Sequence, residues 1–133
     1  MRILFQLLLG FGLMAASSLT ARAQSSDCVF THKAFVEGGV ASGQMRVVNN
    51  GNACEFSFKF GGKFDPSDWK VERAPEHGRV EAGPSGVKYL PDAGYTGADA
   101  FTVAVFGYNP MLGHGHRSRD GRFAINVDVR RAR

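Results

Sequence analysis

The stretch YLPDAGYTGADAFTVAV, residues 89–105, decides the fold of this chain. Pro91 ends the strand before it, because proline cannot donate a hydrogen bond to a β-ladder. Gly94 and Gly97 permit backbone angles that other residues avoid, as a connection between two strands requires. Asp99 can accept backbone N–H bonds and so fix the start of the next strand. We therefore expect a corner between two β-strands here rather than a catalytic site.

Three aromatic residues complete this corner. Tyr89 is expected to end one strand with its ring in the core, and Tyr95 to fold its ring back beneath the turn. Phe101 then begins the inward-facing set of the strand that follows, whose apolar side chains alternate with smaller or more polar ones.

Alternation of apolar and polar residues continues through the chain. CEFSFKF, residues 54–60, places a cysteine and three phenylalanines on one face, and RFAINVDVR, residues 122–130, has the same pattern. Strict alternation is typical of strands with one solvated face, as in antiparallel sheets. Asn50-Gly51 favours a type I′ hairpin turn between two of these strands. We expect seven or eight strands, near residues 29–36, 44–48, 53–60, 69–73, 79–82, 87–90, 100–106 and 122–130.

Strands this short and regular predict an all-β fold, an antiparallel β-sandwich of two packed sheets. Trp69 and the inward phenylalanines are expected to fill its interior. The chain has 133 residues and no internal repeat, which fits one such domain.

The first residues predict export. Arg2 precedes a nearly unbroken apolar run over residues 3–16, and Ala21-Arg22-Ala23 has the small-x-small pattern of a signal cleavage site. We expect a signal peptide at residues 1–23 and a β-sandwich domain at residues 24–133, located in the periplasm or secreted to the cell surface. A retained membrane anchor is the alternative, but the apolar run is short for a spanning helix.

Cys28 and Cys54 are the two cysteines of the chain. In an exported protein two cysteines are expected to pair, and their spacing does not fit a C-x-x-C redox or zinc motif. In the chain-entropy model such a disulfide bond stabilises the fold by about 3.5 kcal/mol. We therefore interpret the pair as a structural crosslink.

The segment APEHGRVEAGPSGVKYLPDAGYTGADAFTVAV, residues 74–105, resembles the bacterial immunoglobulin-like (Ig-like) and cadherin-like repeats of large surface proteins. Those repeats share a P-x-H-G-x-V turn and a following Y-x-P-x-x-G-[FY]-x-G-x-D-x-F motif. The chain looks like the small single-domain exported Ig-like proteins of proteobacteria. The resemblance implies an Ig-like β-sandwich with a binding or spacer role. It also implies structural roles for Pro75, His77, Gly78, Tyr89, Pro91, Gly94, Tyr95, Gly97, Asp99 and Phe101.

Cadherin repeats bind calcium through acidic linkers, and the scattered carboxylates of this chain do not predict such a site. The insertion GYNPMLGHGHRSRDG, residues 107–121, suggests a different metal. Met111, His114 and His116 are candidate copper ligands, because imidazole and thioether groups suit copper, with nickel or zinc less favoured. A solvated, glycine-rich loop is the alternative, and His77 or His32 could complete a site only if the fold brings one close.

Arginines gather near the end of the sequence, where residues 114–133 contain six arginines and two aspartates. Basic groups beside an aromatic ring can bind an anion or anchor a protein. We expect a partner-binding surface for a protein or an anionic envelope component, such as a phosphorylated glycolipid, and not for nucleic acid. Its candidate residues are Tyr108, Arg117, Arg119 and Arg122. A solvated loop and a frayed terminus are the alternative.

We can name no serine nucleophile elbow, reactive cysteine or paired-acid motif in the sequence, so we expect no catalytic residues. The sequence favours a non-catalytic binding or structural module of the periplasm or cell surface. A copper-binding protein is the alternative, and a hydrolase is a more distant one. The oligomeric state stays open.

Overall fold

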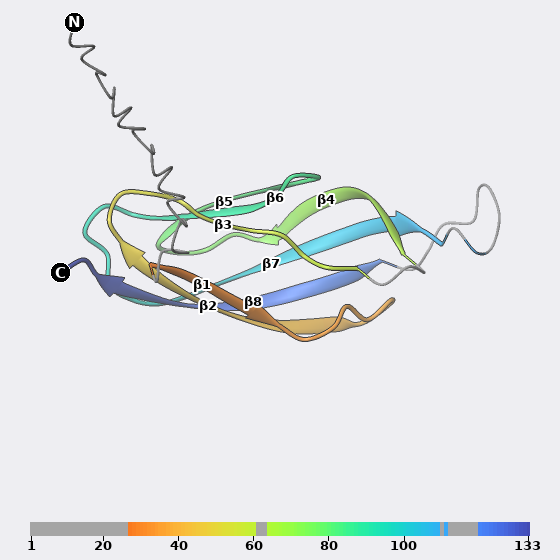
Figure 1. Ribbon diagram of the computed structural model, residues 1–133, viewed down its shortest axis with the longest axis horizontal. Helices are drawn as coiled ribbons and strands as arrows, with labels where there is room; N and C mark the ends of the chain where they lie inside the picture. Colours follow the sequence, from red (N-terminus) through yellow and green to blue (C-terminus); the bar gives the residue numbers. More distant parts are fainter. Residues whose placement is uncertain (1–26, 61–63, 110, 112–119) are drawn as a thin grey trace, which may run out of the picture.

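A computed structural model describes residues 27–60, 64–109, 111 and 120–133. The predicted signal peptide lies outside these residues. The described chain forms eight strands (Figure 1). Their bounds are β1 Cys28–His32, β2 Val40–Asn49, β3 Cys54–Phe56, β4 Asp65–Arg73, β5 Gly78–Gly83, β6 Gly86–Pro91, β7 Gly97–Tyr108 and β8 Gly121–Arg131.

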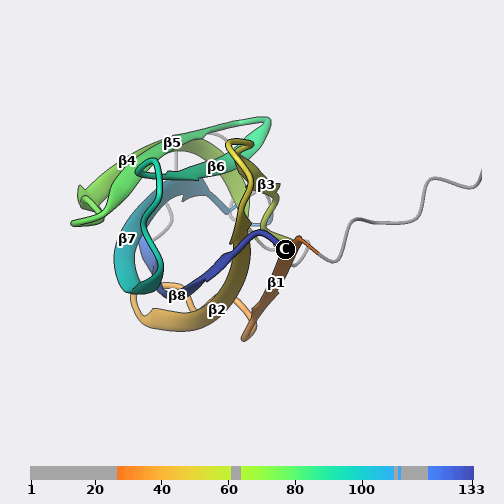
Figure 2. The same cartoon turned by 90° about the vertical axis from the view of Figure 1, so that its left-hand side faces the viewer.

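The strands form two sheets packed face to face, seen end-on in Figure 2. The larger sheet has five strands in the order β1-β2-β8-β7-β4, and the smaller has three in the order β3-β6-β5. The prediction of an all-β sandwich with seven or eight strands is therefore confirmed. The two sheets differ in size, because the strands of the smaller sheet have 3 to 6 residues whereas β7 and β8 have 12 and 11.

The core follows directly from the alternation in the sequence. In β8, Phe123, Ile125, Val127 and Val129 are buried, and the intervening Asn126, Asp128 and Arg130 are exposed. Burying each large apolar side chain of this kind stabilises the fold by about 1.5–3 kcal/mol. The buried apolar cluster comprises Ala41, Met45, Val47, Cys54, Phe64, Val87, Tyr89, Phe101, Val103, Val105, Phe123, Ile125, Val127 and Val129. Trp69 is only partly buried and packs against this cluster.

One strand pair differs from the antiparallel pairing that we predicted. Strands β2 and β8 are parallel, with Val40 opposite Arg122 and Asn49 opposite Arg131. Parallel neighbours need a long connection, and here the chain between β2 and β8 includes the entire smaller sheet. Alternation alone cannot reveal this, because it has the same period in parallel and antiparallel strands.

The predicted type I′ hairpin at Asn50-Gly51 is wrong. Strand β2 belongs to the larger sheet and β3 to the smaller one, so this connection crosses between the sheets. Gly51 has a φ of 85°, but Asn50 does not have the positive φ that a type I′ turn requires at both positions. Instead, the Oδ1 of Asn50 accepts a hydrogen bond from the backbone N–H of Asn52, at 3.0 Å. Asparagine favours this local turn as readily as a hairpin.

The strand predicted at residues 53–60 ends at Phe56. Its partner β6 begins at Gly86, where the β5–β6 hairpin turns, and so no neighbouring strand continues the ladder. The side chains still alternate, because Phe58 and Phe60 pack against the core while Lys59 is exposed. Strands β2 and β4 begin earlier than predicted, at Val40 and Asp65.

The disulfide bond between Cys28 and Cys54 is present, as predicted, with a Cα–Cα distance of 5.3 Å. It joins β1, at the edge of the larger sheet, to β3, at the edge of the smaller one. Cys54 is buried in the core. The bond therefore links the two layers along one open side of the sandwich.

Candidate functional site

The corner within residues 89–105 is organised by the carboxylate of Asp99. One oxygen accepts backbone N–H bonds from Glu76, at 3.0 Å, and Ala100, at 2.9 Å. The other accepts a bond from the His77 backbone, at 3.1 Å, and one from the Tyr89 hydroxyl, at 2.8 Å. Asp99 is 9% exposed. The backbone N–H bonds expected for this residue are therefore present, and they connect the start of β7 to the turn before β5.

Burial is the main reason why the pKa of Tyr89 lies far above its ordinary value, and the hydrogen bond to the Asp99 carboxylate adds to the effect. The Tyr89 hydroxyl is thus a permanent donor at neutral pH. The Tyr89 hydroxyl must stay protonated to donate to the Asp99 carboxylate. Because the two groups are hydrogen-bonded to each other, we interpret the pair as structural.

The glycines and the second tyrosine shape the outer part of the corner. Gly94 and Gly97 have φ values of 76° and 136°, which glycine tolerates and other residues rarely adopt. The Tyr95 ring stacks on the His77 ring with centroids 4.0 Å apart. Its hydroxyl donates to the carbonyl of Ala98, at 2.5 Å. His77 is therefore held in a structural contact within the P-x-H-G turn.

Asn49 connects this corner to the end of the larger sheet. Its side-chain amide donates to the carbonyls of Asp92, at 2.8 Å, and Tyr95, at 3.0 Å. Asn49 is the last residue of β2 and lies opposite Arg131, the last residue of β8. The corner thereby fixes the end of the molecule at which β2 and β8 both terminate.

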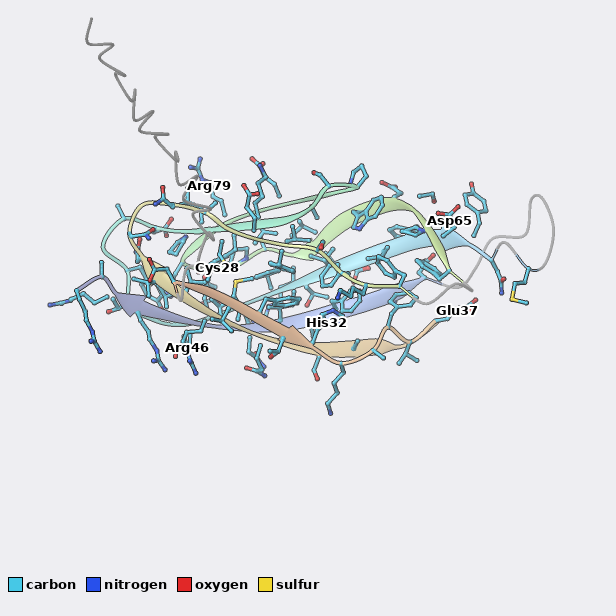
Figure 3. All side chains as sticks on the ribbon, in the orientation of Figure 1. Cys28, His32, Glu37, Arg46, Asp65 and Arg79 are labelled. Atoms are coloured by element: carbon cyan, nitrogen blue, oxygen red, sulfur yellow. A yellow bond between two sulfur atoms is a disulfide. The ribbon has the colours of Figure 1, made fainter. Side chains whose placement is uncertain are left out.

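A hollow of about 640 Å³ lies at this same end. We call it the arginine hollow, and its lining residues are Asp27, Arg46, Val48, Asn50, Arg130, Arg131, Ala132 and Arg133. Figure 3 shows Arg46 toward the end of the molecule where the C-terminus lies, whereas Glu37 and Asp65 mark the opposite end. Its lining has four arginines and one aspartate, and a cleft with an excess of one sign of charge attracts ions of the opposite sign.

The arrangement of the arginine hollow follows from strand phase and register. Arg46 and Arg130 point outward because their neighbours Val47 and Val129 point into the core. In the parallel register, Arg46 lies opposite Asp128, and Val48 lies opposite Arg130. Two arginines that are far apart in the sequence therefore share one outer face near the chain terminus.

Charge pairing in the arginine hollow is incomplete. The Nε of Arg130 donates to Asp128, at 2.9 Å, and this pair is exposed to solvent. Asp27 accepts a hydrogen bond from the uncharged side-chain amide of Asn50, at 3.3 Å. Within the part of the chain that the structure describes, no carboxylate forms an ion pair with the other arginines of the hollow, Arg46, Arg131 and Arg133.

The partner surface predicted around Tyr108 and Arg122 lies at the opposite end of the sandwich, where β7 ends and β8 begins. Tyr108 is 44% exposed. Arg122 forms two hydrogen bonds to the carboxylate of Glu72, at 2.7 and 3.0 Å, and the bonded guanidinium holds the pKa of Glu72 below its ordinary value. Arg117 and Arg119 lie outside the described residues. Arg122 is thus already paired, a point that its sequence position did not indicate.

Met111, the described member of the candidate copper set, is 71% exposed at this end. His114 and His116 lie outside the described residues, so the copper hypothesis stays a prediction. His77 is stacked on Tyr95, and the ring of His32 lies among those of Phe30, Phe58 and Phe123. Over the described residues, no group of three or more His, Cys, Asp or Glu side chains could hold a metal ion.

An aromatic groove of about 270 Å³ lies where the smaller sheet stops short of the larger one. Its aromatic lining consists of Phe58, Phe60 and Trp69, with Pro66 and Pro84 beside them. The sequence placed these aromatic residues in the interior. They are partly exposed because the β5–β6 hairpin turns at Gly83–Gly86. Beyond this turn, irregular chain and not a strand of the smaller sheet covers the larger sheet.

No family model and no curated protein matches this sequence. Over the described ranges, the structure has no helix long and apolar enough to cross a membrane. The described residues define a two-sheet, disulfide-linked β-sandwich with a basic hollow at one end.

Proposed function

We propose that this chain is an exported, non-catalytic Ig-like module that acts by binding, or as a structural support, in the periplasm or at the cell surface. The observation that carries the proposal is the strand order. In immunoglobulin folds, strands B, E and D lie in one sheet, and strands G, F and C lie in the other. In chain order, β3-β6-β5 and β8-β7-β4 correspond to these two sets.

The corner network adds support for the Ig-like and cadherin-like resemblance. The motif residues Tyr89 and Asp99 bond to each other, and Asp99 accepts the backbone N–H of His77 from the P-x-H-G turn. These contacts agree with the structural roles that the resemblance implies for the three residues.

Export is supported by the disulfide bond. Disulfide bonds persist in the periplasm and outside the cell, whereas the cytoplasm keeps thiols reduced. The Cys28–Cys54 bond links two edge strands, so the fold holds the two cysteines close enough to form a disulfide bond in an oxidising compartment. A binding role is supported by the arginine hollow, whose incompletely paired guanidinium groups favour an anionic partner.

Cell fractionation with thiol labelling tests this proposal. We expect the full-length gene product to be recovered from the periplasm or the medium, shortened by about the length of residues 1–23, with no thiol that reacts under denaturing conditions. A variant carrying Ala21→Leu and Ala23→Leu should keep its full length, because the small residues at the cleavage site are lost. Recovery of the unshortened wild-type protein from the cytoplasm, with two reactive thiols, would contradict the proposal.

A further inference from the structure

We infer that the arginine hollow binds anions that carry two or more neighbouring phosphoryl groups. This inference rests on the proposed function as an exported binding module and names the chemistry of its ligand. It concerns the end of the sandwich at which β2 and β8 terminate, opposite the loop that the sequence indicated.

The cationic groups of the hollow are all guanidinium groups. Each guanidinium offers a planar fork of N–H donors that pairs with two oxygens of one phosphoryl group. Arg46 is fixed in the middle of the β2–β8 ladder, whereas Arg131 is at its end and Arg133 lies two residues beyond. These three side chains form no ion pair with a described carboxylate, so their donors are available to a ligand.

The size of the hollow favours a ligand larger than one phosphate ion. A water molecule in the liquid occupies about 30 Å³, and the hollow holds about 640 Å³. A single phosphate ion fills only a small part of this space. A ligand with two or more linked phosphoryl groups can contact several of the arginines together, and each further contact then costs little additional ordering.

Acidic residues in and beside the hollow limit the kind of ligand that can bind. Asp128 neutralises Arg130, and Asp27 lies on the wall, bonded to Asn50. A weakly charged ligand gains little against these carboxylates. Attraction to the guanidinium groups and repulsion from Asp27 both scale with the charge of the ligand. Because the guanidinium groups outnumber Asp27 in the lining, the net attraction grows with that charge. Phosphoryl groups carry up to two negative charges each near neutral pH.

Calorimetric titration of the purified protein tests the inference, with pyrophosphate, orthophosphate and sulfate as probes at low ionic strength. We expect pyrophosphate to bind about tenfold more tightly than either single anion, or better, and its affinity to fall as sodium chloride is added. Equal affinities for the three anions, or no binding of pyrophosphate, would overturn it.

Two double variants locate the site. Arg46→Gln/Arg131→Gln removes two guanidinium groups of the hollow, and Lys70→Gln/Arg73→Gln removes two exposed cations of β4. Both lower the net charge equally. We expect the first to weaken pyrophosphate binding about tenfold or more and the second to change it less than about twofold. Equal weakening in both would show a general charge effect and overturn the inference. Unchanged thermal unfolding confirms that each variant is folded.

Vesicles identify the source of the phosphoryl groups. Cardiolipin carries two phosphoryl groups in one headgroup, and phosphatidylglycerol carries one. We compare sedimentation of the protein with phosphatidylcholine vesicles that contain either cardiolipin or phosphatidylglycerol at equal charge. More protein sedimenting with the cardiolipin vesicles would assign the ligand to a lipid headgroup. Pyrophosphate binding without this preference would assign it to a soluble ligand. Intact pyrophosphate binding by a protein that proves cytoplasmic would remove the export proposal alone, and absent binding by an exported protein would remove this inference alone.

Discussion

Asp99 is the carboxylate on which the corner depends, because four donors converge on it from the turn before β5, from β6 and from β7. Replacing it by Asn keeps the shape and removes the charge. Hydrogen bonds to charged groups contribute about 1.5–3 kcal/mol, so we expect Asp99→Asn to lower the free energy of unfolding by about 2 kcal/mol or more. Urea denaturation measures this, with Asp92→Asn, at an exposed position of the same corner, as the control. An equal effect of the two variants would contradict the assignment.

Tyr89 provides a pH test of the same contact. Its folded-state pKa is raised above the unfolded value, so its contribution to stability is fully present below about pH 10 and is lost as pH rises beyond the unfolded pKa. We expect the free energy of unfolding to fall above about pH 10, by up to about 1.4 kcal/mol per pH unit from this residue. Tyr89→Phe should show a shallower fall, and Tyr108→Phe, at an exposed tyrosine, the same fall as the wild type. A fall equally steep in Tyr89→Phe would exclude this role.

At the residue scale, the sequence predicted the corner well because its signals are local. Pro91, Gly94 and Gly97 each act through their own backbone geometry, and the bond from the Ala100 N–H to Asp99 is equally local. The bonds from Glu76 and His77 to Asp99 are not local, because they span 23 and 22 positions. The bond from Asn49 to this corner was not predictable, because it joins residues 43 and 46 positions apart. Nor was the pairing of Arg122 with Glu72, 50 positions apart.

The close approach of strands β4 and β7 depends on a residue without a side chain, Gly107. Gly107 lies in β7 opposite Pro66, and a Cβ added there would come within 2.4 Å of the Asp65 carbonyl oxygen and 2.7 Å of the Phe64 ring. The backbone of β4 would have to move to make room for this Cβ, at a cost in free energy. We therefore expect Gly107→Ala to lower the free energy of unfolding by about 2 kcal/mol.

Gly83→Ala is the matched control, because a Cβ at Gly83 meets nothing within 4 Å and the residue does not have a positive φ. We expect a change within about 0.5 kcal/mol there. Thermal or urea unfolding of the two variants compares them directly. A loss of stability at Gly83 as large as that at Gly107 would mean that the close approach of β4 and β7 is not the cause.

At the element scale, the existence of the strands was predictable and their partners were not. Period-two alternation reports which side chains face the core, as in β8, but carries no information on the neighbouring strand. This is why Asn50-Gly51 suggested a hairpin where the chain crosses between sheets, and why the end of β3 at Phe56 could not be anticipated.

For the whole molecule, the Cys28–Cys54 bond is the crosslink between the two sheets. It closes a loop over a sequence separation of 26, for which chain entropy gives a stabilisation of about 3.5 kcal/mol. We expect reduction of the wild-type protein to lower the free energy of unfolding by about this amount, measured by urea denaturation with and without reductant. Cys28→Ala/Cys54→Ala should show no response to reductant. Equal stability of oxidised and reduced wild type would contradict the role of the bond.

At the scale of the whole molecule, the arginine hollow is formed by residues from three separate parts of the sequence. In the sequence, Arg122 and Arg130 belong to one basic segment. In the structure they lie near opposite ends of β8, an 11-residue strand, and are therefore roughly 30 Å apart. Arg46 joins the later arginines because β2 and β8 are parallel, which the alternation did not reveal. The sequence thus indicated basic charge near the C-terminus, but not that Arg122 and the arginine hollow lie at opposite ends of the sandwich.

The measurement that tests the binding role most directly is an NMR titration of the ¹⁵N-labelled protein with pyrophosphate. We expect the largest changes in backbone amide shifts at Arg46, Val48, Asn50 and residues 130–133, with little change at Tyr108 and Arg122. Changes confined to the Tyr108 end, or spread evenly over exposed cations, would contradict the assignment of the arginine hollow as the binding site.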